Sequence, residues 1–326
     1  MKRQFLYKNG LRLLYALDSN WLYALIRRSA VSKVSQLLIH ITNACNYDCR
    51  YCYVDKDGEP LSRDVWFTVL REAKKIGVKK VGVLGGEPFA CSFLEDILEH
   101  ARRLGLSILI YTNGSLIDDS WISRLKKYDP VLIFKYDADN ETYSYHTNQT
   151  RYSLERIEKV MADCHAAGIH VMTFTTLLRK NVRQVGSIFE RSVALGALPA
   201  FERYIPVKDD SVNRDLEITN DEYSSAMRSI LSRIQTWNKE LIAALRLAGG
   251  GCGCYRSILS ITNTGEVLPC PYIPESFSIG NMRDESLCTI WRRWEKEKGD
   301  VRRLSDACRR CDQLQICGGG CFTYSQ

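Results

Sequence analysis

The 326-residue chain lacks any long run of uncharged apolar residues. No stretch approaches the roughly 18 residues that a membrane-spanning helix needs. The amino-terminal run Met1–Phe5 is basic, but Lys8, Arg12 and Asp18 interrupt any apolar segment that would make it a secretory signal. These absences argue against a membrane span and an export signal. Together with the many unpaired thiols they predict a protein of the reducing cytoplasm.

The chain also lacks a long basic run with interleaved aromatic residues. Its formal charge of +7 is therefore weak evidence for a nucleic-acid partner, and none is expected. The content of 45% hydrophobic and 25% charged residues is typical of a soluble globular protein. The length suffices for one large α/β domain or two smaller ones. Histidines number only five, whereas the thirteen cysteines cluster at spacings typical of metal sites.

Three cysteines lie together as C-x3-C-x2-C: Cys45, Cys49 and Cys52, with the aromatic Tyr51 directly before the third. Three thiolates can hold three irons of a 4Fe–4S cluster and leave the fourth iron open for a substrate or cofactor. The alternative is a structural zinc loop. Zinc prefers four tetrahedral ligands, however, and no fourth Cys or His lies nearby, since His40 is upstream within an expected strand. The spacing therefore favours an iron–sulfur cluster with an open coordination position.

Apolar strands and helical stretches alternate from Ser35 onward, which predicts a parallel sheet with helices outside. The expected strands are 37–42, 80–84, 107–112, 131–136, 170–176 and 201–207, and the expected helices are 62–76, 93–104, 118–127, 153–167 and 182–195. Six strands are too few for a closed eight-stranded barrel, so we predict a partial (β/α)6 barrel, similar to a TIM barrel. Functional groups should gather where strands end, and the cysteine loop directly follows the first strand.

The sequence suggests three regions. Residues 1–34 are expected to form a helical leader, and residues 35–248 the partial barrel with a connecting helix. That helix is predicted over Asp221–Leu247, capped by Thr219 or Asn220, and three consecutive glycines then end it. Residues 249–326 are rich in cysteine and poor in periodic segments, so metal ligation is expected to hold them together.

A glycine-rich turn, Gly85-Gly86-Glu87-Pro88, follows the second expected strand. Glycines let the backbone approach a ligand closely, and the Glu87 carboxylate is suited to an ammonium group. By itself this run is typical of a tight turn. One strand–helix unit after the cysteine triad, it favours a ligand site. Together the two motifs resemble the signature of the radical S-adenosylmethionine (SAM) enzymes.

The resemblance implies that SAM chelates the open iron. It also implies that an electron, from an external donor such as flavodoxin or ferredoxin, cleaves SAM to methionine and a 5′-deoxyadenosyl radical, which abstracts a substrate hydrogen. The cofactor-binding residues implied are Tyr51, Gly85, Gly86, Glu87, Pro88, Thr112, Asn113, Lys135 and Arg151. Asn113 is equally consistent with a plain turn. Arg151 is included because Asn148 stands where the family has an arginine.

Candidate catalytic residues are the three cysteines and four residues near the ends of the fourth and sixth strands: Cys45, Cys49, Cys52, Tyr136, Asp137, Glu202 and Tyr204. Many peptide-modifying relatives carry Ser-Leu-Asp-Gly at the fourth strand, whereas this chain has Lys135-Tyr136-Asp137-Ala138. An alternative role for Glu202, Arg203 and Tyr204 is a satisfied ion pair beneath the cysteine-rich region.

The carboxy-terminal cysteines resemble the SPASM motif, an addition to radical SAM barrels that binds auxiliary 4Fe–4S clusters. The first half of the motif resembles Cys254-x10-Gly265-x4-Cys270. Its second half resembles Cys308-x2-Cys311-x5-Cys317-x3-Cys321. The hairpin and helix that connect the two halves resemble Ile279–Met282 with Leu287 and Trp291. The alternative is a zinc ribbon. The family pattern implies a first auxiliary cluster on Cys252, Cys254, Cys270 and Cys321 and a second on Cys308, Cys311 and Cys317.

The fourth ligand of the second auxiliary cluster is open: Cys288, Asp306, Asp312, solvent or substrate would each complete it, and one auxiliary cluster instead of two also fits. Cys91 and Cys164 lie on expected helices and are predicted to be buried rather than ligating. Three loaded clusters would lower the net charge from +7 to about +2 or +3.

The leading hypothesis is a radical SAM/SPASM oxidoreductase that modifies a peptide or protein side chain, in peptide maturation or crosslinking. The first alternative is the same chemistry on a small molecule, such as a tetrapyrrole or a sugar-containing metabolite. The second is a non-enzymatic iron–sulfur or zinc protein, which requires the glycine-rich turn and the cysteine arrangement to coincide by chance.

Overall fold

The structure is a computed structural model that describes residues 34–54, 57–137, 140–206, 213–237, 254, 257–297 and 310. The expected helical leader thus lies outside the described residues, except for its last position. Within the described part, every helix is too short or too polar to cross a lipid bilayer.

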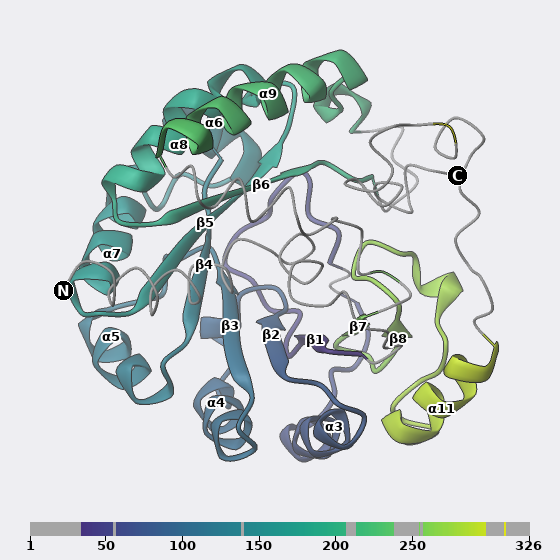
Figure 1. The fold of residues 1–326 in the computed structure, drawn as a ribbon. Helices are drawn as coiled ribbons and strands as arrows, with labels where there is room; N and C mark the ends of the chain where they lie inside the picture. The colour runs from purple at the N-terminus through teal and green to yellow at the C-terminus, as the bar shows by residue number, and fades with distance from the viewer. Residues whose placement is uncertain are drawn as a thin grey trace.

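A curved sheet forms the centre of the fold, with the order β6-β5-β4-β3-β2-β1-β7-β8 (Figure 1). Its strands are β1 (Gln36–His40), β2 (Lys80–Leu84), β3 (Ser107–Thr112), β4 (Val131–Lys135), β5 (His170–Leu177), β6 (Leu198–Arg203), β7 (Ile258–Ile261) and β8 (Val267–Leu268). All neighbouring pairs are parallel except β7 and β8. The predicted α/β fold, a partial barrel of parallel strands, is confirmed.

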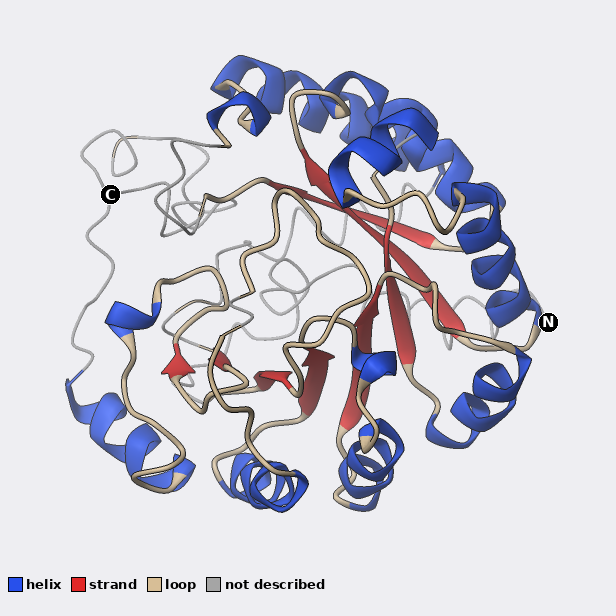
Figure 2. Cartoon of the chain, turned by 180° about the vertical axis from the view of Figure 1, so that it is seen from behind, coloured by secondary structure: helices blue, strands red, loops and turns tan. Residues whose placement is uncertain are grey.

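Helices cover the outer side of this sheet (Figure 2). They are α3 (Arg63–Lys75), α4 (Leu94–Arg103), α5 (Asp119–Leu125), α6 (Asn140–Thr147), α7 (Leu154–Ala166), α8 (Val185–Ala194) and α9 (Asn220–Trp237). In α3 the buried residues Trp66, Val69, Leu70 and Ala73 recur at helical spacing. That spacing gives the helix one apolar stripe, which packs against the sheet.

The two faces of the sheet differ in composition along the strands. Successive side chains point to opposite faces, so every second residue faces the inside of the barrel, here called the lumen. The middle of the lumen is apolar, lined by Leu109, Ile133, Met172 and Leu198. Two residues after Ile133 on β4 comes Lys135, and four after Leu198 on β6 comes Glu202. The polar groups of the lumen therefore lie at the carboxyl ends of the strands.

Several boundaries differ from the sequence-based expectation. Helix α6 was not predicted, because its sequence Asn140–Thr147 is polar and lacks an apolar period. Strand β6 begins at Leu198, which pairs with Met172, rather than at Phe201. Thr219 is confirmed as the cap of α9, since its hydroxyl accepts the Glu222 N–H (3.2 Å) and the Glu222 carboxylate accepts the Thr219 N–H (2.8 Å). The remainder of the long helix predicted to Leu247 lies outside the described residues.

The carboxy-terminal segment continues the barrel sheet, because β7 pairs in parallel with β1. The expected hairpin is present: the Val267 N–H donates to Gly280 O (2.8 Å) and the Ile279 N–H to Val267 O (2.9 Å). The expected helix follows as α11 (Leu287–Glu297), which buries Leu287 and Trp291.

Candidate active site

The cysteine loop and the glycine-rich turn are in direct backbone contact at the carboxyl ends of β1 and β2. The Gly86 N–H donates to Thr42 O and the Glu87 N–H to Ala44 O, both at 2.8 Å. A Cβ atom at Gly86 would lie 2.2 Å from the Ala44 oxygen, so only glycine permits this approach. The structure thus joins the two motifs that the sequence separates by about 35 residues.

The end of β3 joins the contact between the loop and the turn, because its residues donate hydrogen bonds to the Glu87 carboxylate, which is 1% exposed. The Thr112 hydroxyl donates to Oε1 (2.7 Å), the Asn113 N–H to Oε2 (2.8 Å) and the Phe89 N–H to Oε1 (3.2 Å). Burial nevertheless raises the pKa of Glu87 to about 7, because those neutral donors offset only part of the desolvation. A buried carboxylate held by neutral donors suits an ammonium ligand.

The three cysteines lie on the loop that follows β1, and burial strongly affects the thiol of Cys49. Burial raises the pKa of Cys49 far above its usual value, and the nearby charges of Cys52 and Cys45 raise it further. Without a metal the Cys49 thiol therefore stays protonated, and bound iron would displace the proton and bind the thiolate directly. Among the described residues, no three His, Cys, Asp or Glu side chains converge as ligands of one metal ion. A 4Fe–4S cluster does not need such convergence, because each thiolate binds a different iron.

Helix α6, which the sequence did not reveal, holds the cysteine loop in place. The buried hydroxyls of Tyr47 and Tyr143 are 3.0 Å apart, within hydrogen-bonding distance. The Arg50 N–H, in the same loop, donates to His146 O at 2.9 Å. Two turns of a polar helix therefore fix the loop between the first and third cysteines.

Tyr143→Phe is expected to lower the free energy of unfolding by about 1 kcal/mol, because the buried Tyr47 hydroxyl loses its hydrogen bond to Tyr143. It should also speed amide hydrogen exchange in residues 45–52, measured by mass spectrometry. Tyr128→Phe is the matched control, since it removes a half-buried bond to Glu95 (3.0 Å) between helical segments outside this loop. Equal exchange in the loop of both variants would contradict the holding role of α6.

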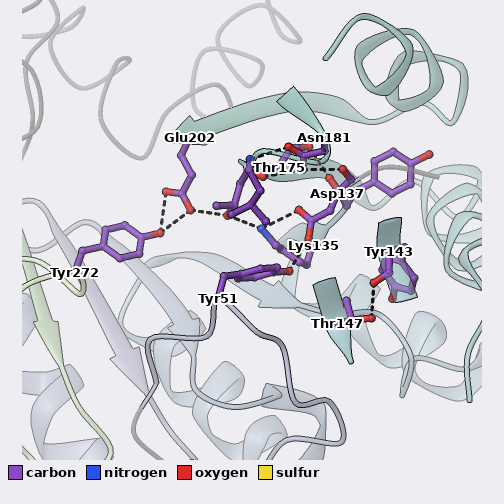
Figure 3. A network of polar contacts seen from close by, with 12 residues as sticks. Tyr51, Lys135, Asp137, Tyr143, Thr147, Thr175, Asn181, Glu202 and Tyr272 are labelled. Carbon is purple, nitrogen blue, oxygen red and sulfur yellow. Dashed lines mark hydrogen bonds and ion pairs between the residues drawn. The ribbon is translucent and has the colours of Figure 1, made fainter. Parts of the chain in front are cut away.

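A chain of polar contacts crosses the lumen at the ends of β4, β5 and β6 (Figure 3). Lys135 Nζ lies 3.0 Å from Asp137 Oδ1 and 2.5 Å from the Thr176 hydroxyl. The Tyr51 hydroxyl, from the cysteine loop, donates to Asp137 Oδ2 at 2.5 Å. The predicted residues Tyr51, Lys135 and Asp137 are therefore brought together.

The same chain continues to Glu202 on β6. The Thr176 hydroxyl lies 3.2 Å from Glu202 Oε1, and the Tyr272 hydroxyl lies 2.8 Å from both carboxylate oxygens. Tyr272 follows β8, and its ring meets the Tyr53 ring edge-on at 4.9 Å. Residues from both edges of the open sheet thus meet at one carboxylate (Figure 3).

Three predicted positions are placed elsewhere. Tyr136 was expected at the lumen rim with its neighbours, but strand alternation turns it outward, where its hydroxyl donates to Glu158 (2.6 Å). Arg151 is exposed and lies over the Tyr152 ring at 5.5 Å. Arg203, which was considered as an ion-pair partner in an alternative role for this group, donates to Ile218 O (2.7 Å) and to Asn220 Oδ1 (2.6 Å).

Tyr204 is 4% exposed and packs in a small cluster with Leu178 and Leu216, against which Tyr51 also lies. It is therefore near the lumen rim but enclosed by apolar side chains. This packing supports a role in positioning Tyr51 rather than a direct contact with a reacting group.

Some residues of the site carry weak signals in the sequence. Tyr272 lies two residues after Cys270, which was the only available pointer to it. Asn46 follows Cys45 and accepts a hydrogen bond from the Asn113 side chain (3.0 Å), and it donates to the Ser115 hydroxyl (2.8 Å). These polar residues tie the cysteine loop to the end of β3.

Of the expected auxiliary-cluster ligands, Cys254 is buried and Cys270 half-buried. The others, Cys252, Cys308, Cys311, Cys317 and Cys321, lie outside the described residues. The auxiliary ligand set therefore stays a prediction.

Comparison with known families finds two matching models. The model described as the radical SAM superfamily matches residues 39–191, and the one described as the SPASM iron–sulfur cluster-binding domain matches residues 252–312. These ranges contain the cysteine loop with the glycine-rich turn, and the segment from β7 to α11, respectively.

Similar proteins include a PqqA peptide cyclase of Methylocella silvestris, 26% identical over 323 residues, which cover 87% of this chain and 82% of the relative. A nucleotide dehydratase dependent on S-adenosylmethionine, from Lacinutrix mariniflava, is 32% identical over 123 residues, 35% of this chain and 26% of that protein. The crystal structure of Streptococcus suis SuiB bound to its precursor peptide SuiA has the same fold, with a TM-score of 0.73 and 18% identity over 93% of this chain and 75% of SuiB.

Proposed function

The chain belongs to the radical SAM superfamily and carries a SPASM domain, and on this premise we propose that it oxidises or crosslinks a side chain of a peptide or protein. The observation that supports this most is the convergence of three elements at the carboxyl end of the barrel. The cysteine loop contacts the glycine-rich turn through backbone hydrogen bonds and the polar lumen chain through Tyr51. The similarity to a peptide cyclase over most of both chains favours a peptide substrate.

The enzyme uses 4Fe–4S clusters and SAM, which together supply a 5′-deoxyadenosyl radical when bound. We propose that Cys45, Cys49 and Cys52 hold the SAM-binding cluster. The carboxylate of Glu87 would receive the SAM ammonium, with Thr112 and Asn113 fixing its orientation. Gly85, Gly86 and Pro88 shape the turn that carries it.

On the substrate side, we propose that Glu202 contacts the peptide from the lumen wall, while the fully buried Asp137 acts through its neighbours. Asp137 orients Tyr51 beside the third cysteine, and Lys135 balances the charge of Asp137. The apolar floor of the lumen excludes water from below, which protects a radical from quenching. An external reductant such as flavodoxin or ferredoxin would supply the electron.

The test is isotope transfer in anaerobically reconstituted enzyme with SAM and a flavodoxin reducing system. Short peptides encoded beside its gene, deuterated at one residue type at a time, are added, and 5′-deoxyadenosine is analysed by mass spectrometry. We expect one deuterated peptide to give deuterated 5′-deoxyadenosine, and the same peptide without label to give a product two mass units lighter than itself. SAM cleavage without deuterium transfer from any such peptide would count against the proposal.

A nucleotide-containing small molecule is the second candidate. It is favoured by the similarity to the nucleotide dehydratase, although that match spans only 123 residues. The same assay separates the two, because nucleoside triphosphates deuterated in the sugar would then label 5′-deoxyadenosine while the peptides would not.

A further inference from the structure

The lumen chain contains more negative than positive charge. Its side chains include one cation, Lys135, and two carboxylates, Asp137 and Glu202. The ion pair of Lys135 is with Asp137, at 3.0 Å. The hydrogen-bond donors of Glu202 are the two neutral hydroxyls of Thr176 and Tyr272. Within the part of the chain that the structure describes, Glu202 is therefore the carboxylate of this group without a directly bonded cation.

The surroundings of Glu202 offset its desolvation only in part. Burial raises its pKa to about 7 and Asp137 adds to the rise, whereas Lys135, Tyr272 and Thr176 oppose it. The pKa values of the neighbouring Tyr272 and of Tyr53 lie well above 10. These hydroxyls therefore stay neutral between pH 6 and 8 and do not supply or remove charge.

The Glu202 carboxylate also has unused capacity to accept hydrogen bonds. An ionised carboxylate offers about four lone-pair sites, and among the described residues two hydroxyl groups donate to it. Glu202 is half-buried rather than enclosed, and it lies on β6, an edge strand of the described sheet. Figure 3 shows its side chain directed toward Lys135 and Tyr272, inside the barrel. Glu202 therefore keeps part of its surface accessible.

We propose that Glu202 is the docking point for a cationic group of the substrate, an ammonium or guanidinium, so that the modified peptide presents a lysine or arginine side chain to the lumen. This inference rests on the proposed function. A carboxylate substrate group would be repelled by Glu202 and Asp137, and an apolar one would leave Glu202 unpaired. A cation forms a charge-assisted hydrogen bond and completes the charge balance of the group.

The experiment uses the reconstituted holoenzyme with SAM under anaerobic conditions and two small probes. Nα-acetyl-lysine amide carries the ammonium, and Nα-acetyl-norleucine amide has a similar shape without charge. Binding is measured by equilibrium dialysis at pH 6, 7 and 8. We expect the lysine probe to bind at least about tenfold more tightly at pH 8. Its affinity should fall about tenfold from pH 8 to pH 6, because Glu202 becomes protonated while the lysine ammonium stays charged.

Glu202→Gln should remove both the preference for lysine and its pH dependence. Glu190→Gln is the control with the same change in net charge, since Glu190 is exposed and pairs with Arg233 on the outer helices. A second variant, Tyr272→Phe, keeps the carboxylate but removes a hydroxyl that favours its ionised form. It should shift the midpoint of the pH dependence upward, and this result does not depend on the folding of the Gln variant.

Equal binding of the two probes, or lysine binding unchanged in Glu202→Gln, would overturn the inference. SAM cleavage without any probe reports on the proposed function separately. If cleavage is present and the lysine preference is absent, only the docking role fails. If cleavage is absent from wild-type enzyme that has its full iron content, the proposed function itself fails.

Discussion

Cys45→Ala should reduce SAM cleavage about a thousandfold or more, because the cofactors carry the chemistry and the protein alone has none to replace it. Two thiolates cannot hold the cluster with its open iron in place. Cys45 and Cys49 pack against the apolar core, so the remaining thiols cannot rearrange freely to take over the missing position. The measurement is 5′-deoxyadenosine formation under reducing, anaerobic conditions, with the iron content determined in parallel.

The matched control is Cys164→Ala. Cys164 is fully buried on α7, and burial raises the pKa of its thiol to about 12, so it is an inert core residue. Its loss should cost about 1 kcal/mol of stability through a small cavity, with SAM cleavage unchanged. Full SAM cleavage in Cys45→Ala, or its loss in the control, would contradict the assignment of the cluster to the loop after β1.

Most of the fold was predictable because its elements carry strong periodic signals. The strand 80–84 and the helix beginning after Ser62 were placed within a residue or two of β2 and α3. Buried parallel strands read as short apolar runs, and α3 has a clear apolar stripe. Helix α6 was not predicted, because its contacts are with the cysteine loop and its own sequence has no apolar period. The pairing of β7 with β1 was hidden for a similar reason, since it joins segments more than 200 residues apart.

The residues of the candidate site also differ in whether a local sequence pattern could locate them. Motifs at fixed spacing, such as the cysteine triad and Gly85–Pro88, pointed to the correct ends of β1 and β2. Glu202 was named because it was expected at the end of the sixth strand, facing the cavity, yet its contact with Tyr272 depends on how the carboxy-terminal segment packs. Tyr136 was misplaced because composition alone does not give the facing of a strand's last residues. Long-range packing, not local sequence pattern, decides which residue contacts Glu202 and which way the Tyr136 side chain points.

Gly86→Ala is the second substitution with a large expected effect, because it separates the two motifs that form the site. The added methyl would lie 2.2 Å from Ala44 O and 2.5 Å from Ala44 C. Both are backbone atoms next to Cys45, so relief requires the cysteine loop or the turn to move. Movement of either breaks the bond from the Glu87 N–H to Ala44 O and displaces the Glu87 carboxylate. We expect SAM affinity to fall about a hundredfold, which corresponds to about 2.7 kcal/mol.

The measurement is the change in the electron paramagnetic resonance spectrum of the reduced cluster on titration with SAM. Gly105→Ala is the matched control: it inserts the same methyl group at a position with φ +67°, where Lys74 Nζ at 3.8 Å is the nearest atom. There the cost is backbone strain of about 1 kcal/mol, and SAM binding should be unchanged. A loss in both variants would point to general destabilisation. A loss in Gly86→Ala alone would show that SAM binding depends on the close backbone approach of the turn to the cysteine loop, whereas undiminished affinity in that variant would contradict it.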